Sequence, residues 1–147
     1  MKKSLAIMCA VVFGVTMLLA AGIYAESADC PETIKMKNEQ AFEEHKQPIV
    51  EFSHGKHAAE DGYGIGCGEC HHDEKGEPLA DLEPGDDVQG CFECHSGTGA
   101  GTPKDFMGPK PDAEALESYY TAVHVNCVGC HKEQGGPKSC TECHEKE

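Results

Sequence analysis

Residues 127–144 read CVGCHKEQGGPKSCTECH, which contains the pattern Cys-x-x-Cys-His twice. The same pattern occurs twice earlier in the chain, at residues 67–71 and 91–95. Two thiols three positions apart can add to the two vinyl groups of one porphyrin, and the histidine that follows then becomes an axial ligand of its iron. Cys-x-x-Cys-His is the attachment signature of c-type haem, so four copies predict four covalently bound haem c groups.

Eight cysteines and four histidines belong to these motifs. The expected haem-attachment cysteines are Cys67, Cys70, Cys91, Cys94, Cys127, Cys130, Cys140 and Cys143, and the expected first axial ligands are His71, His95, His131 and His144. We expect each motif to form about one helical turn, because residues three apart share a helix face. Outside the motifs, Cys9 lies in the expected leader peptide, and we interpret Cys30 as a solvent-exposed thiol in an N-terminal tail.

Five further histidines are available as second axial ligands: His45, His54, His57, His72 and His124. Four are needed, so the count favours four bis-histidine irons, which are closed to substrates and have low potentials because histidine–methionine ligation raises them. Met36 or Met107 is the alternative ligand for one iron, but we interpret both as packing residues and His45 as a surface histidine. Because His71 and His72 are adjacent, we expect His72 to reach a different haem.

The composition predicts that haems, rather than side chains, form the core. The formal net charge is −14, and near −16 without Lys2 and Lys3 of the expected leader. In residues 26–147, Leu, Ile, Val and Phe make up only about 12% of the chain. So few apolar side chains with so large a charge normally indicate disorder. Four haems would supply one large apolar group for about every 30 residues and remove the contradiction.

Residues 1–25 are typical of a secretory signal peptide, with two lysines before the apolar run Leu5–Leu19 and small residues after it. The alternative is an uncleaved membrane anchor, because the uncharged stretch Leu5–Tyr24 is long enough to span a bilayer. Export agrees with the motifs, since bacterial haem c is attached outside the cytoplasm. We therefore predict a periplasmic protein, with membrane association through a partner or through this segment as the alternative.

We predict one tetrahaem domain over residues 48–147, preceded by a polar N-terminal extension at 26–47. The expected fold is mostly irregular, with a few short α-helices and a minimal β-hairpin near the N-terminus that includes Pro48–Phe52. Asp112 is expected to cap the clearest helix, in which Leu116, Tyr119, Tyr120 and Val123 recur at helical spacing. A helical turn is expected around Glu39–Lys46. Glycine and proline predict loops at residues 62–68, 76–90 and 97–111.

The order of these elements resembles the tetrahaem cytochromes c3, the class III cytochromes c of sulfate-reducing bacteria. The chain reads Phe52-Ser-His54-Gly-Lys-His57, then a motif followed at once by a second histidine, a motif, an isolated histidine and two closely spaced motifs. The resemblance implies a fold wrapped around four haems. It also implies four ligand pairs: His71 with His54, His95 with His72, His131 with His57, and His144 with His124. Phe52 matches an aromatic residue that packs between haems in this family.

The resemblance implies an electron carrier without catalytic residues, and redox proteins as its partners: a basic cytochrome c3, hydrogenase or a transmembrane electron-transfer complex. No nucleic-acid partner is expected. All four motifs have two residues between their cysteines, and the lysines near the fourth motif are balanced by glutamates. Both features are similar to the acidic, type II branch of the family. Fast direct exchange with hydrogenase is not favoured, because electrostatic steering requires complementary patches.

Two other functions fit parts of the pattern. A multihaem reductase needs an iron with an open coordination site, whereas here the histidines suffice to close every iron. Zinc can be held by paired Cys-x-x-Cys motifs with histidine, but this leaves the five additional histidines without a role. Binding of carbon monoxide to the reduced protein would indicate a reductase, and a colourless protein with stoichiometric zinc would indicate a zinc site.

Overall fold

The structure is a computed structural model that describes residues 30–99, 101–108 and 111–146. The predicted signal peptide or anchor, residues 1–25, lies outside these residues. No helix in the described part of the chain combines the length and the apolar character needed to cross a bilayer.

The fold consists of short elements joined by irregular segments. In chain order these are β1 (Ile34–Lys35), β2 (Glu51–Phe52), α2 (His54–Ala58), the 3-10 turn η1 (Cys67–Glu69), α3 (Cys91–Cys94), α4 (Pro103–Met107), α5 (Ala113–Leu116), α6 (Tyr119–Gln134) and α7 (Cys140–Cys143). In the described residues only α6 exceeds five residues. The strands β1 and β2 form one antiparallel pair. This confirms the predicted mostly irregular fold with a minimal β-hairpin.

The region predicted as one helix from Asp112 forms two helices. The Asp112 carboxylate accepts a hydrogen bond from the Ala115 N–H at 2.9 Å and caps α5, as expected. The helix is interrupted before α6 because the backbone there pairs with Gly97: the Gly97 N–H donates to the Glu117 carbonyl, and the Tyr119 N–H donates to the Gly97 carbonyl. The long helix α6 then carries the third Cys-x-x-Cys-His motif in its last turns.

One prediction on local structure was wrong, and another is confirmed only in part. The predicted loop 97–111 contains α4, because Pro103 suits the first helical turn and the Thr102 N–H donates to the Asp105 carboxylate. The helical turn expected around residues 39–46 is reduced to its beginning, where the Phe42 N–H donates to the Asn38 carbonyl at 3.2 Å, and it does not continue as a helix. Instead, the Asn38 side chain accepts hydrogen bonds from two following backbone N–H groups, which stabilises a tight turn.

Residues before Pro48 pack on the rest of the fold. Ile34 pairs with Phe52 in the β-hairpin, and the Ala41 side chain is only 3% exposed. The Phe42 ring lies 6.1 Å from the ring of Tyr119, centroid to centroid, at the start of α6. The N-terminal segment therefore helps to fix the position of α6.

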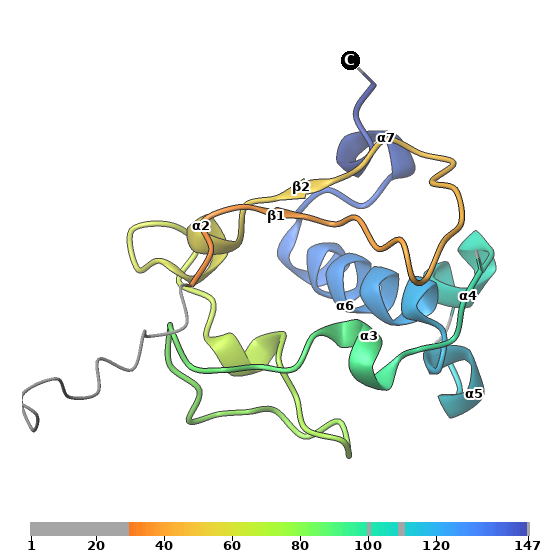
Figure 1. Cartoon of the computed structure of the whole chain (residues 1–147). Helices are drawn as coiled ribbons and strands as arrows, with labels where there is room; N and C mark the ends of the chain where they lie inside the picture. The colour runs from red at the N-terminus through yellow and green to blue at the C-terminus, as the bar shows by residue number, and fades with distance from the viewer. Residues whose placement is uncertain (1–29, 100, 109–110, 147) are drawn as a thin grey trace, which may run out of the picture.

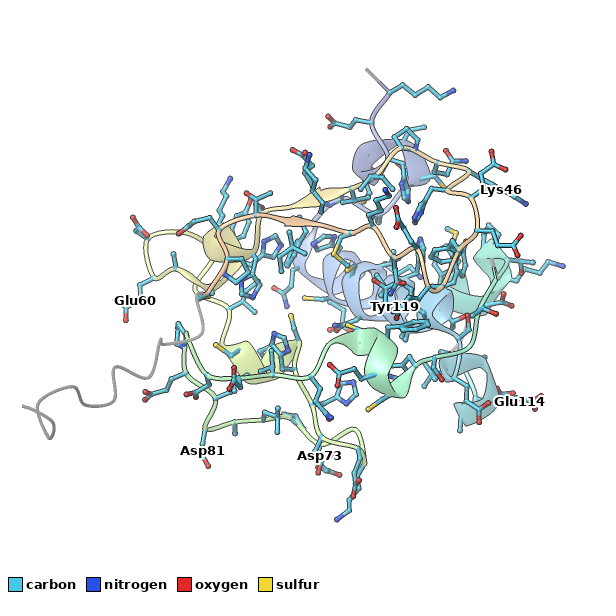
Figure 2. All side chains as sticks on the ribbon, in the orientation of Figure 1. Lys46, Glu60, Asp73, Asp81, Glu114 and Tyr119 are labelled. Carbon is cyan, nitrogen blue, oxygen red and sulfur yellow. The ribbon has the colours of Figure 1, made fainter. Side chains whose placement is uncertain are left out.

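The helix α6 lies at the centre of the molecule. In Figure 1, the β-hairpin and α7 lie on one side of it, and η1 and α3 on the other. Figure 2 shows Glu60, Asp73, Asp81 and Glu114 at the periphery, whereas Tyr119, the first residue of α6, lies nearer the middle. Among the described side chains, only Ala41, Phe106 and Val128 are buried and apolar. So small an apolar core agrees with the composition, and haem as the remainder of the core stays a prediction.

Candidate haem-binding site

The four Cys-x-x-Cys-His motifs all form helical turns, as predicted. They coincide with η1, α3, the C-terminal part of α6, and α7. In the motifs outside α6, the histidine N–H donates to the carbonyl of the first cysteine, at 2.9 Å for His71 and His95 and at 2.8 Å for His144. Each turn therefore places both thiols and the histidine of its motif on one short, rigid segment.

Glutamates inside two motifs stabilise these short turns. The Gly90 N–H donates to the Glu93 carboxylate at 2.9 Å, and the Ser139 N–H donates to the Glu142 carboxylate at 2.9 Å. The hydrogen bonds from Ser139 and Lys138 hold the pKa of the Glu142 carboxyl below its ordinary value. A carboxylate in the first turn satisfies an N–H group that the helix leaves unpaired. These glutamates thus act as caps for α3 and α7.

The Cys127 thiol is influenced by a thiol from each of the other three motifs. Burial is the largest cause that raises its pKa to about 11, and the neighbouring thiols of Cys70, Cys143 and Cys91 raise it further. The surface of Cys127 is nevertheless accessible. Cys127 therefore has protein around it, while its own surface is not covered by direct neighbours. One thiol from each of the other motifs lies near enough to contribute to its pKa.

The expected axial ligands lie together in four pairs, which are the four pairs implied by the family resemblance. The distances between imidazole centroids are 6.3 Å for His54 and His71, 5.9 Å for His72 and His95, 6.2 Å for His57 and His131, and 6.3 Å for His124 and His144. Adjacent residues His71 and His72 thus face different partners.

This spacing fits one iron between the two rings of each pair. The bond between a metal and an imidazole nitrogen is about 2 Å long, and the ring centre lies roughly 1 Å beyond that nitrogen. Two opposed rings on one metal are therefore about 6 Å apart, centre to centre. Two imidazoles in direct contact or bridged by a hydrogen bond have no reason to keep this spacing four times. The donor set also fits, because imidazole suits iron. The residues present therefore match bis-histidine haem.

Hydrogen bonds at Nδ1 fix the tautomer and anchor one ring atom of seven of the eight rings. A carbonyl can only accept, so Nδ1 is the donor and Nε2 is left free to bind a metal. The acceptors are the carbonyls of Pro31 for His54, Ser53 for His57, Asp73 for His72, Leu116 for His95, Tyr120 for His124, Pro137 for His131 and Pro48 for His144, at 2.5 to 3.0 Å. Among the described contacts, His71 is the exception.

Burial favours the neutral, metal-binding form of two of these histidines. It lowers the pKa of His124, with a smaller contribution in the same direction from the facing His144. Burial also lowers the pKa of His71, and the nearby His54 and His72 lower it further. A metal requires deprotonated imidazole nitrogen. The environment of these rings therefore favours the protonation state that iron needs.

Aromatic side chains pack against several of the paired imidazoles. Phe52 lies 4.6 Å from the His57 ring and 5.8 Å from the His54 ring, centroid to centroid. It therefore contacts rings from two different pairs. Phe106 lies 4.5 Å from the His124 ring, a contact that the sequence did not predict.

Three interpretations of residues outside the site need correction. Cys30 is half-buried, and its Sγ lies 3.6 Å from His54 Nδ1, so it is not an exposed thiol in a free tail. His45 is half-buried against Phe42, and its Nε2 is buried with no hydrogen-bond partner among the described residues, so it is not an ordinary surface histidine. Met107 is 52% exposed rather than packed. The contact of Cys30 with His54 joins segments 24 positions apart, so no local pattern indicated it.

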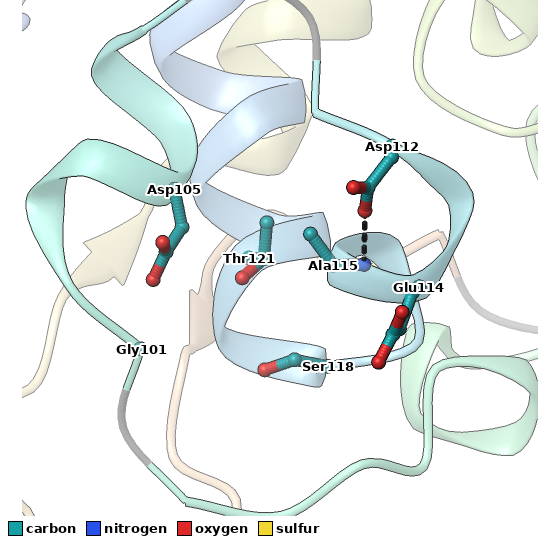
Figure 3. A pocket seen from close by; sticks show the side chains of 7 residues that line it. All are labelled: Gly101, Asp105, Asp112, Glu114, Ala115, Ser118 and Thr121. Atoms are coloured by element: carbon teal, nitrogen blue, oxygen red, sulfur yellow. Dashed lines mark hydrogen bonds between the residues drawn. The ribbon is translucent and has the colours of Figure 1, made fainter.

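Two surface hollows lie near these elements. One, of about 380 Å³, is lined by acidic side chains of α4 and α5, and Figure 3 shows that the Asp112 carboxylate is used there as the cap of α5. The other, of about 300 Å³, is bounded by His71 and His72. The second hollow therefore belongs to the region of the paired histidines, and the first does not.

Comparison with known proteins agrees with this geometry. The family model of the class III cytochrome c family matches residues 31–147. A cytochrome c3 of Maridesulfovibrio salexigens is 30% identical over 123 residues, covering 80% of this chain and 97% of that protein. A cytochrome c3 of Desulfovibrio desulfuricans is 32% identical over 126 residues, covering 80% and 98%. The chain therefore belongs to the class III cytochromes c, a family of multihaem electron carriers with covalently bound haem c.

Proposed function

We propose that this chain is an exported, low-potential electron carrier with four haem c groups, each held between two histidines. The ligand pairs are His71 with His54, His95 with His72, His131 with His57, and His144 with His124. The observation that carries the proposal is the repeated spacing of about 6 Å in these four pairs. Haem iron supplies one-electron redox chemistry when bound.

The side chains divide the work of holding and tuning the irons. The eight motif cysteines tether the porphyrins, and the paired imidazoles close both axial positions, which excludes substrates and keeps the potentials low. The Nδ1–H hydrogen bonds to backbone carbonyls help to hold the rings in place. Rigid ligation suits a carrier, because the site then changes little between oxidation states. We therefore propose that the protein is not an enzyme.

Shared segments bring the four sites close to one another. His71 and His72 are neighbours in sequence but belong to different pairs, and His54 and His57 lie in or beside one turn of α2 and also serve different pairs. A fold of this size has a radius of gyration of roughly 14 Å. Its ligand sites are therefore near neighbours, which favours fast exchange of electrons inside the molecule.

The acidic surface is proposed to select the partners. The net charge of −14 predicts attraction to basic surfaces and repulsion from acidic ones. Candidate partners are a basic cytochrome c3, hydrogenase and a transmembrane electron-transfer complex, and the charge favours the first. The charge and the four short motifs support assignment to the acidic, type II branch. The lysines and apolar run of residues 1–25 support export to the periplasm.

A spectroscopic redox titration of the purified mature protein tests the proposed ligation. We expect four haems per chain, only six-coordinate low-spin spectra in both oxidation states, and no carbon monoxide binding after reduction. A substantial high-spin fraction, or carbon monoxide binding without loss of a histidine, would contradict bis-histidine ligation and favour a reductase. Stopped-flow mixing with a reduced basic cytochrome c3 at low and high salt then tests the carrier role, because electrostatic steering predicts slower transfer at high salt.

A further inference from the structure

The four histidine pairs fall into two classes by the angle between their rings. The rings are close to perpendicular in the pairs His54–His71 and His72–His95, at 82° and 70°. They are closer to parallel in the pairs His57–His131 and His124–His144, at 34° and 31°. The first class uses the two N-terminal motifs and the second the two C-terminal motifs. One chain therefore presents two kinds of axial ligand arrangement.

We propose that Phe106 is a positioning residue that sets the His124 ring nearly parallel to the His144 ring and thereby fixes the electronic class of that iron site. The inference rests on the proposed bis-histidine ligation. It adds a role for a residue that lies outside every motif, and it concerns how the ligand is oriented rather than which residue is the ligand.

Phe106 is built into the fold so that it can hold a ring in place. It lies on α4, whose first turn is secured by Pro103 and by the hydrogen bond from the Thr102 N–H to Asp105. Its side chain is 9% exposed, which makes it one of the few buried apolar groups in the described residues. Its ring stacks on His124 at 4.5 Å and 25°, the most nearly parallel of the described aromatic contacts.

A second contact and a hydrogen bond complete the fixation of His124. The Tyr120 ring lies 4.3 Å from His124 and 5.7 Å from Phe106, so the two aromatic rings approach the imidazole from directions roughly at right angles. His124 Nδ1 donates to the Tyr120 carbonyl at 2.7 Å. The hydrogen bond fixes one atom of the ring but permits rotation about the bond direction. The face-on contact with Phe106 restricts that rotation.

The ring angle matters because each imidazole donates π electron density in one plane. Two parallel rings act on the same iron d orbital and separate it in energy from its partner, which gives a rhombic low-spin ferric signal in electron paramagnetic resonance (EPR). Two perpendicular rings act on different orbitals and leave the two nearly equal in energy, which gives a highly anisotropic low-spin signal. Neighbouring residues that orient a ligand thus tune the metal.

EPR of the oxidised, fully haem-loaded protein tests the proposal. In the wild type, half of the low-spin intensity should be rhombic and half highly anisotropic. In Phe106→Leu and Phe106→Met, which fill the space without a flat ring, about a quarter of the total intensity should leave the rhombic signal while the optical spectrum stays low-spin. Phe106→Tyr keeps the ring and should retain the wild-type spectrum. Phe42→Leu is the matched control, because Phe42 contacts Tyr119 and His45 and none of the paired rings.

The outcomes separate this inference from the proposed function. A wild-type spectrum with a single low-spin class, or unchanged rhombic intensity in both Phe106 variants, would overturn the positioning role and leave bis-histidine ligation intact. The role would also be refuted by an equal loss of rhombic intensity in Phe42→Leu. A large high-spin signal in the wild type would instead overturn the proposed ligation itself.

Discussion

Replacing His72 with alanine is expected to open one iron, and not the iron of the motif that His72 follows. The His72 ring faces His95, whereas its neighbour His71 faces His54. The open site should therefore be the haem attached to Cys91 and Cys94. The expected magnitude is one carbon monoxide bound per chain, or a quarter of the haems, against none in the wild type. The fold should survive, because that haem stays attached through Cys91 and Cys94 and keeps His95 as a ligand, and the lost hydrogen bond to the Asp73 carbonyl is worth only about 0.5–1.5 kcal/mol.

Carbon monoxide titration of the reduced protein, followed by optical difference spectra, measures this stoichiometry. The control is His45→Ala, which removes the histidine outside the four pairs and should bind no carbon monoxide. The double variant His54→Ala/His72→Ala should bind two equivalents, because the two histidines belong to different pairs. The pairing would be refuted if His72→Ala bound none, or if the double variant bound only one.

Three further predictions concern single positions. In Gly136→Ala, the new Cβ would lie 2.7 Å from the His131 ring, so we expect an altered optical spectrum of one haem in four. In the control Gly66→Ala, the new Cβ meets nothing within 4 Å, so its spectrum should be that of the wild type, and identical spectra of the two variants would contradict this. Val128→Ala removes two methyl groups from a side chain that is 7% exposed, so the free energy of unfolding should fall by about 1.5 kcal/mol and the melting temperature by several degrees. An unchanged melting temperature would contradict the burial of the Val128 side chain. Burial raises the pKa of Tyr119 above its ordinary 10.0, so its contribution to stability is complete below pH 10 and is lost as the pH rises through the folded-state pKa. The melting temperature of Tyr119→Phe should therefore fall less than that of the wild type at alkaline pH, whereas the exposed control Tyr63→Phe should follow the wild type. Parallel curves of melting temperature against pH for Tyr119→Phe and the wild type would contradict this.

Local signals in the sequence predicted those features that depend on neighbouring residues. Asp112 before an apolar helical pattern predicted the start of α5, and the motif spacing predicted the four helical turns. The adjacency of His71 and His72 predicted that they serve different partners, since two neighbouring side chains cannot approach one iron. Thr102, Pro103 and Asp105 were also a local signal for α4, but the surrounding glycines and prolines favoured a loop.

Features that depend on distant segments could not be predicted. The interruption between α5 and α6 results from pairing with Gly97, about 20 residues away in sequence. The contact of Cys30 with His54 spans 24 positions, and the stacking of Phe106 on His124 joins two helices. The carbonyl acceptors of the imidazoles come from any residue type, because the backbone supplies them. Their identity is set by the fold and leaves no pattern in the sequence.

Haem, rather than apolar side chains, is expected to fill the interior, and the mass of the intact native protein tests this most directly. Material purified from the cells that make it should have the mass of its polypeptide plus four haems. A mass with fewer than four haems in a protein that is folded and cooperative on melting would contradict this view of the molecule.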